Sequence, residues 1–247
     1  LMACMACNTV TSFPPRTLGS AFPSISVRKL LIAAVFTSIL SVQPIVADEL
    51  SATVAKEYDQ HLGALFDYFH RNPELSSLET KTAARLAGEL RQAGFEVTEG
   101  VGGTGIVAML ENGPGPLVMM RADMDGLPVE ERSGLANAST ARQMSPLSGT
   151  DEPVMHACGH DVHITSLVGT ARQMAARKDD WSGTLMLVVQ PAEERIIGAR
   201  AMRDDGIWER FGTPDYALAF HVGAGAPAGK IDAPEGPTYA GADTVDI

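Results

Sequence analysis

The chain has 247 residues, of which 45% are hydrophobic and 20% are charged. This is the composition of an ordinary folded protein with one large domain or two small ones. Its formal net charge of -11 at pH 7 argues against a nucleic-acid partner, because binding to phosphate groups requires a basic surface.

The first 47 residues differ from the rest, because they include basic residues and no acidic one. From residue 27 they show a short basic segment, an apolar run over residues 30–40, and the small residue Ala47 before Asp48. This order is typical of a secretory signal peptide. The apolar run is shorter than the roughly 20 residues of a membrane-spanning helix, so we expect no stable membrane anchor. We expect a signal peptide at residues 27–47, cleavage near Ala47, and a secreted or periplasmic protein; residues 1–26 are an upstream segment without assignment.

Helices and strands are predicted in turn along the rest of the chain. Apolar residues at helical spacing predict helices over residues 50–72 and 79–93, and short apolar runs predict strands at 95–98, 105–110 and 117–121. A polar loop over 123–155 precedes a helix at 162–177, a strand at 184–189, a helix at 198–205 and a strand at 216–221. Residues 223–237 are predicted to be a loop, and 243–247 the start of another strand. The alternation predicts an α/β sheet with helices on both faces.

A glycine-rich segment at residues 100–105 matches the letters of a dinucleotide-binding motif, Gly-x-Gly-x-x-Gly. That motif must follow a strand and open a helix, because the helix N-terminus holds the pyrophosphate. Here the glycines lie between two predicted strands. The segment is therefore predicted to be a tight turn.

Polar side chains follow three of the predicted strands. Asp123 and Asp125 come after the strand at 117–121, Glu193 and Glu194 after the strand at 184–189, and His221 closes the strand at 216–221. In open α/β sheets, ligands bind outside the carboxyl ends of the strands. We therefore expect these side chains to meet at one edge of the sheet.

Residues 155–163 read Met-His-Ala-Cys-Gly-His-Asp-Val-His and hold Cys158, the only cysteine after residue 47. Cys158 and His160 are two residues apart at the start of a predicted helix, so both can reach one metal ion from a turn. Thiolate, imidazole and carboxylate are ligands of transition metals. Two alternatives are a nucleophilic cysteine with a nearby histidine and a buried apolar cysteine. The nucleophile hypothesis leaves Glu193 and Glu194 without a task.

The adjacent residues Glu193 and Glu194 point in different directions, so one can bind a metal ion while the other holds a water molecule. This pairing suits metal-assisted hydrolysis, in which the metal lowers the pKa of water and a carboxylate takes its proton.

Four segments, in this order, resemble the M20 metallopeptidase family, specifically its amidohydrolase branch of hippurate hydrolases, N-acyl-amino-acid deacylases and auxin-conjugate hydrolases. They are Arg121-Ala-Asp-Met-Asp-Gly-Leu-Pro128, Met155-His-Ala-Cys-Gly-His-Asp-Val-His163, Gln190-Pro-Ala-Glu-Glu194 and Phe220-His-Val-Gly223. The resemblance runs from about residue 58 to residue 247. It implies a three-layer α/β/α, zinc-exopeptidase-like catalytic domain, with residues 48–247 as its N-terminal part.

The resemblance also implies a role for each matching residue. Two divalent metal ions, Zn, Mn, Co or Ni, would be bound, with Cys158 as a thiolate shared by both. Glu193 would be the general base, and Asp125 would orient a metal-binding group. The further metal ligands would be His160, Glu194 and His221. His156 and His163 would support these ligands without binding the metal themselves.

The implied reaction is hydrolysis of the amide bond of an N-acyl amino acid. Two alternatives stay open: an aminopeptidase or carboxypeptidase that acts on peptides, and an inactive metal-binding remnant. The sequence departs from the family at residues 195–198, where Arg-Ile-Ile-Gly replaces a usual run of glycines. In the family, a lid or dimerisation domain and a last histidine ligand follow the segment that resembles residues 242–247. We therefore expect a homodimer for an intact protein, and little activity from residues 48–247 alone.

Overall fold

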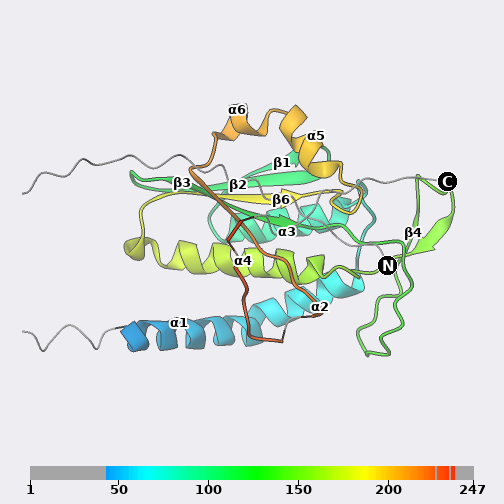
Figure 1. The fold of residues 1–247 in the computed structure, drawn as a ribbon, viewed down its shortest axis with the longest axis horizontal. Helices are drawn as coiled ribbons and strands as arrows, with labels where there is room; N and C mark the ends of the chain where they lie inside the picture. The colour runs from blue at the N-terminus through cyan, green and yellow to red at the C-terminus, as the bar shows by residue number, and fades with distance from the viewer. Residues whose placement is uncertain (1–42, 226, 234, 237–247) are drawn as a thin grey trace, which may run out of the picture. The chain divides into compact units, whose positions relative to one another are not determined.

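The computed structural model describes residues 43–225, 227–233 and 235–236 (Figure 1). The chain divides into two units, one of residues 53–231 and the other of residues 1–52 with 232–247. The first unit contains the sheet and all the predicted site residues. The strand predicted at residues 243–247 lies outside the described residues.

The first helical region begins earlier than predicted and has three parts. Helix α1 (Gln43–Glu57) is followed by a π-helical turn (Tyr58–Leu62) and helix α2 (Gly63–Arg71). Its last helical residue is Arg71, and Asn72 is the C-cap directly before Pro73, where the sequence predicts the end. The predicted cleavage point after Ala47 falls within α1, and residues 27–42 lie outside the described part, so the signal peptide stays a prediction. Among the described helices, none combines the length and apolar character needed to cross a membrane.

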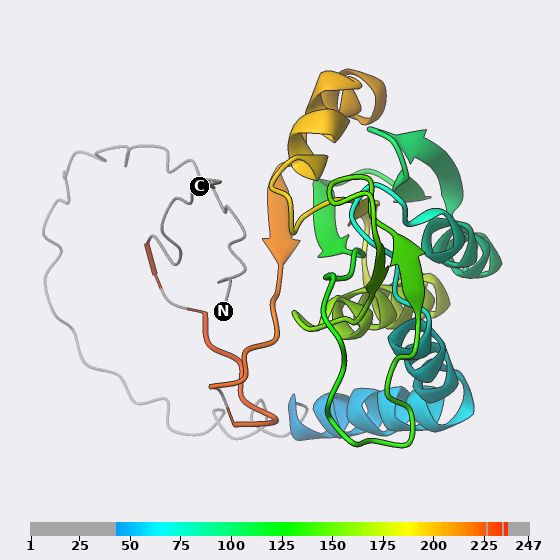
Figure 2. The ribbon, with the colours of Figure 1, turned by 90° about the vertical axis from the view of Figure 1, so that its right-hand side faces the viewer.

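Within the described residues, five strands form the central sheet. They are β1 (Glu96–Val101), β2 (Gly105–Asn112), β3 (Leu117–Asp123), β6 (Gly183–Gln190) and β7 (Tyr216–Ala219), in the order β1-β2-β6-β3-β7. The pairs β1–β2 and β2–β6 are antiparallel, whereas β3 runs parallel to both β6 and β7. The carboxyl ends of β3, β6 and β7 therefore lie at one edge of the sheet, as expected. Figure 2 shows β7, in orange, as the outermost of these strands.

Helices cover both faces of the sheet (Figure 1). Helices α2, α3 (Thr80–Gln92) and α4 (His160–Ala176) lie on one face, and the short helices α5 (Gly198–Asp204) and α6 (Ile207–Phe211) on the other. Each face has its own apolar core, the larger one beneath α3 and α4, with Leu86, Leu90, Ile164 and Leu167 fully buried. The predicted three-layer α/β/α architecture is confirmed.

Two details differ from the sequence-based expectations, and a third agrees with them. The loop predicted over residues 123–155 contains a small antiparallel pair, β4 (Arg142–Met144) with β5 (Asp151–Pro153). Strands of three residues carry too little periodicity to be recognised in a sequence. Strand β7 ends at Ala219, so the prediction that His221 closes a strand is wrong. The glycine-rich segment 100–105 joins β1 to β2 as a hairpin, which confirms the predicted turn.

Two helical glycines are expected to respond in opposite ways to alanine. A Cβ at Gly88 in α3 would meet nothing within 4 Å, so Gly88→Ala should raise the free energy of unfolding by about 0.5–1 kcal/mol through helix propensity. A Cβ at Gly198, the first residue of α5, would lie 1.5 Å from the backbone carbonyl oxygen of Pro191. The backbone would have to move, and overpacking costs about 1–3 kcal/mol, so Gly198→Ala should destabilise the chain. Urea unfolding of both variants measures this, and a stabilising Gly198→Ala would contradict the packing of α5 against the segment after β6.

Candidate metal centre

The ends of the parallel strands bring the predicted site residues together. Asp123 is the last residue of β3 and pairs with Gln190, the last residue of β6. The backbone then turns out of the sheet on both strands. Asp125 follows β3 by two residues, and Glu193 and Glu194 follow β6 by three and four. His221 lies two residues beyond β7, on the segment that leaves the sheet.

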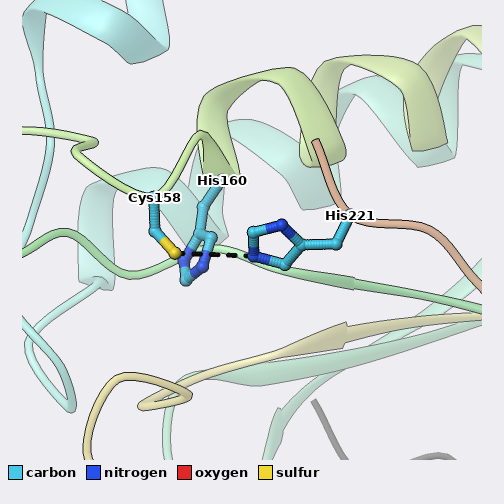
Figure 3. Close-up of side chains that lie close together, drawn as sticks. All are labelled: Cys158, His160 and His221. Atoms are coloured by element: carbon cyan, nitrogen blue, oxygen red, sulfur yellow. Dashed lines mark hydrogen bonds between the residues drawn. The ribbon is translucent and has the colours of Figure 1, made fainter. Parts of the chain in front are cut away.

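Cys158, His160 and His221 point toward one another, Cys158 from the turn before α4, His160 from the first residue of α4 and His221 from the segment after β7 (Figure 3). One ligand atom of each lies within 4.8 Å of the others, and Cys158 Sγ is 3.4 Å from His221 Nε2. Gly159 between the first two has φ +82°, and a Cβ there would lie 2.3 Å from Val222 Cγ2. Only glycine combines this backbone conformation with so close an approach of the His221 segment.

His160 is fully buried and its tautomer is set by a neighbour. Its Nδ1 lies 2.8 Å from the backbone carbonyl oxygen of Asp125, which can only accept a hydrogen bond. The proton is therefore on Nδ1, and Nε2 keeps its lone pair. Nε2 lies 3.7 Å from a carboxylate oxygen of Glu193 and 3.7 Å from one of Glu194. His160 thus joins the Cys158 side of the cluster to the two glutamates, and its Nε2 is the atom that would bind a metal ion.

The Asp125 carboxylate holds the backbone that carries Glu193 and Glu194. It accepts hydrogen bonds from both of their backbone N–H groups, each at 3.1 Å, and from Ser76 Oγ at 2.6 Å. The sequence predicts that Asp125 orients a metal-binding group. In the structure its carbonyl group contacts His160 while its carboxylate fixes the glutamate loop.

Glu194 has the properties expected of a carboxylate that faces a cation. Burial raises the pKa of Glu194 to about 7, and the charges of Asp125 and Glu193 add to this effect while His160 opposes it. Its Oε1 is buried and has no hydrogen-bond partner among the described residues. A buried carboxylate oxygen without a donor is costly unless a cation compensates it. The orphaned oxygen and the thiol, imidazole and carboxylate set around it fit a divalent metal ion such as zinc.

A second trio, Asp123, His160 and His163, also has ligand atoms within 4.8 Å of one another. The ring of His163 is occupied, however, because Nδ1 bonds to Asp123 at 2.6 Å and Nε2 accepts the Val222 N–H at 3.0 Å. Although burial opposes it, hydrogen bonding from His163 and the charge of Arg121 hold the pKa of Asp123 well below its usual range. His163 therefore supports the segment of His221 from behind.

His156 is buried close to the cluster, but its two ring nitrogens have no hydrogen-bond partner in the described part of the chain. Burial lowers the pKa of His156 to about 4, so the ring is neutral at pH 7. The structure thus gives His163 a supporting contact and shows none for His156. The sequence analysis did not single out Ser76 and Glu79. Their side chains bond to Asp125 and Ala192, which are distant from them in the sequence.

Comparisons with known proteins agree with this geometry. The profile of peptidase family M20/M25/M40 matches residues 119–236. The hippurate hydrolase of Campylobacter jejuni is 42% identical over 62% of the chain and 37% of its own length. The chain belongs to the M20 peptidase family. The match to a hippurate hydrolase also confirms the amidohydrolase branch indicated by the motifs.

Two further relatives of this M20 chain agree with the assignment. Thermostable carboxypeptidase 2 of Saccharolobus solfataricus is 38% identical over 78% of the chain and 47% of its own length. The YXEP protein of Bacillus subtilis, a dinuclear metal-binding M20 peptidase, superimposes with a TM-score of 0.61 at 30% identity over 70% of the chain and 45% of its own. The chain thus spans less than half the length of these relatives.

The stability of the metal-free chain is expected to depend on pH through Glu194. Its pKa is about 7 in the folded chain and 4.5 for the ordinary side chain, so the folded chain holds the proton more tightly. As pH rises from about 4.5 to about 7, the wild type loses stability relative to Glu194→Gln, and below this range the two are alike. Urea unfolding with a chelator at about pH 4 and about pH 8 measures the difference. An equal difference at both pH values would rule out a raised pKa.

Proposed function

We propose that the whole protein hydrolyses the amide bond of N-acyl amino acids with the help of divalent metal ions. The observation that carries this proposal is the convergence of Cys158, His160, Glu194 and His221 at one edge of the sheet, with the Glu193 carboxylate beside them. The similarity to a hippurate hydrolase supports the same reaction class.

The ligands proposed for the metal centre are the thiolate of Cys158, the carboxylate of Glu194, and the imidazoles of His160 and His221. When bound, a divalent ion would lower the pKa of a water molecule and polarise the acyl carbonyl group. We propose two ions, by analogy with the dinuclear YXEP protein. This ligand set suits Zn, Mn, Co or Ni, and the supply of metal in the compartment would decide between them.

We propose Glu193 as the general base. Its side chain is 5% exposed, and its backbone N–H is fixed by Asp125. Glu193 would take a proton from water as the water oxygen bonds to the acyl carbon. It would then pass this proton to the amide nitrogen as the carbon–nitrogen bond breaks, which releases an acid and an amine. Adjacent residues of one loop thus take different tasks, the ligand at Glu194 and the base at Glu193.

The alternative substrates are peptides, since a carboxypeptidase is also similar to this chain. We favour N-acyl amino acids because the relative with 42% identity is a hippurate hydrolase, and hippurate is itself an N-acyl amino acid. Rates on an N-benzoyl amino acid and on a dipeptide, compared in the same preparation of the whole protein, distinguish the two. A faster dipeptide reaction would move the assignment to the peptidases.

We further propose that the protein is exported through the signal at residues 27–47, to the periplasm or the exterior, and that the whole protein is a homodimer. The basic-then-apolar pattern before Asp48 supports export. The mass of the mature N-terminus after cell fractionation tests it, and a product that retains residue 27 would contradict it. Light scattering of the purified protein tests the dimer.

Replacing the two adjacent glutamates is expected to separate the base from the ligand. In the whole protein, Glu193→Gln should keep bound metal and lower kcat by about 10²–10⁴-fold, because it removes the proton acceptor. Glu194→Gln should instead lose metal, because a ligand is gone. The two variants are matched controls, being the same substitution one position apart. Metal content by mass spectrometry and kcat at saturating metal are the measurements, and equal metal loss in both would make Glu193 a ligand.

A further inference from the structure

The loop that presents the two glutamates has a strained backbone. Ala192, directly before Glu193, has φ +46°, and Ile196 beyond Glu194 has φ +56°. The left-handed region costs non-glycine residues on the order of 1–3 kcal/mol, so it persists only where the surroundings impose it. One further non-glycine residue among those described has a positive φ: Ser77, at +68°, in the turn before helix α3.

One buried carboxylate bonds to two of these strained residues. Glu79 is 0% exposed, and its Oε1 accepts the backbone N–H of Ser77 at 2.9 Å and that of Ala192 at 2.8 Å. Its Oε2 accepts a hydrogen bond from Thr104 Oγ1 at 2.6 Å, in the β1–β2 hairpin. Glu79 therefore ties three segments together that are up to 113 residues apart in the sequence.

The contacts of Glu79 complement those of Asp125. Asp125 accepts the N–H groups of Glu193 and Glu194 together with Ser76 Oγ, whereas Glu79 accepts the N–H groups of Ala192 and Ser77. Three successive N–H groups of the glutamate loop are thus bound by two buried carboxylates. The same two carboxylates bind two successive residues of the turn at 76–77. The glutamate loop and this turn are held to each other with no direct hydrogen bond needed between them.

We propose that Glu79 is a positioning residue of the metal centre, which holds Ala192 in its left-handed conformation and so sets the direction of Glu193 and Glu194. This rests on the proposed function insofar as the glutamates are ligand and base. Neither Glu79 nor Thr104 belongs to the predicted ligand set. The role of Glu79 is geometric, since both backbone N–H groups are bound by a single oxygen, Oε1.

The geometric role makes glutamine an informative replacement. Burial raises the pKa of Glu79, against the hydrogen bonds from Thr104 and Ala192, and glutamine keeps the length of the side chain without its charge. The amide oxygen of Glu79→Gln can accept both backbone N–H groups, and its NH₂ can donate to Thr104 Oγ1. Glu79→Asp keeps the charge, but its side chain is one methylene shorter and cannot reach all three partners. Thr104→Val is the matched control, because it removes the third partner and leaves Oε1 with its two N–H groups.

The first experiment is hydrogen exchange of the backbone amides of residues 192–198 in the metal-free chain. Glu79→Asp and Glu79→Ala should speed exchange of the Ala192 amide by about 10-fold or more, while Glu79→Gln and Thr104→Val stay within about threefold of wild type. If Glu79→Ala fails to fold, the comparison of Asp with Gln still decides. Equal exchange at Ala192 in these two variants overturns the proposal.

The second experiment measures kcat and KM of the metal-loaded whole protein. Glu79→Asp should lower kcat by about 10–100-fold with a smaller change in KM, and Glu79→Gln should restore it. A Glu79→Gln variant as slow as Glu79→Asp would overturn the positioning role, because a side chain of the same length without the charge would then fail to restore kcat. Wild type that hydrolyses no amide while the exchange pattern holds would reject the proposed function and leave the role of Glu79 intact. Amide hydrolysis by the wild type, together with unchanged exchange in the Glu79 variants, would support the proposed function and reject the positioning role of Glu79.

Discussion

The candidate site depends on the parallel pairing of β3 with β6 on one side and with β7 on the other. Parallel strands have their carboxyl ends at the same edge of the sheet, so whatever follows each strand meets there. In this chain β3 is followed by Asp125, β6 by Glu193 and Glu194, and β7 by His221. The turn before α4 and the first residue of this helix add Cys158 and His160 at the same edge. An antiparallel β3 would send Asp125 to the opposite end of the molecule.

Burial of carboxylates is the second constraint. Glu79, Asp123, Asp125 and Glu193 are all at most 5% exposed, and an ionised group is costly to remove from water unless it is paired or hydrogen-bonded. Glu79 and Asp125 meet this requirement by accepting backbone N–H groups, and Asp123 by contacts with His163 and Arg121. These bonds tie the loops of the site to the sheet and to helix α3. The buried Oε1 of Glu194 has no such partner among the described residues, as is expected of an oxygen that binds a cation.

The histidines of the cluster differ in the hydrogen-bond partners of their ring nitrogens. His160 keeps a lone pair on Nε2 because a carbonyl oxygen takes its Nδ1 proton. His163, on the same helix, uses Nδ1 for Asp123 and Nε2 for the Val222 N–H, which leaves no nitrogen for a metal ion. The two rings lie 5.4 Å apart, centre to centre. Spacing in the sequence makes both candidate ligands, and only their hydrogen-bond partners separate them.

The amino-acid sequence by itself determined the fold class, the family, most helices and strands, and the set of residues that gather at the candidate metal centre. These follow from local patterns, namely apolar periodicity, Asn72-Pro73 at a helix end, and the Cys-Gly-His turn. Strands β4 and β5 and the end of β7 could not be predicted, because such short elements depend on their neighbours more than on their own residues. Only the tertiary structure decided that Glu79 and Ser76 belong with Ala192 and Asp125, and which histidine nitrogens are occupied. The reason is physical: these contacts join segments about 50 to more than 100 residues apart, and hydrogen bonding at such separations leaves no periodic trace in a sequence.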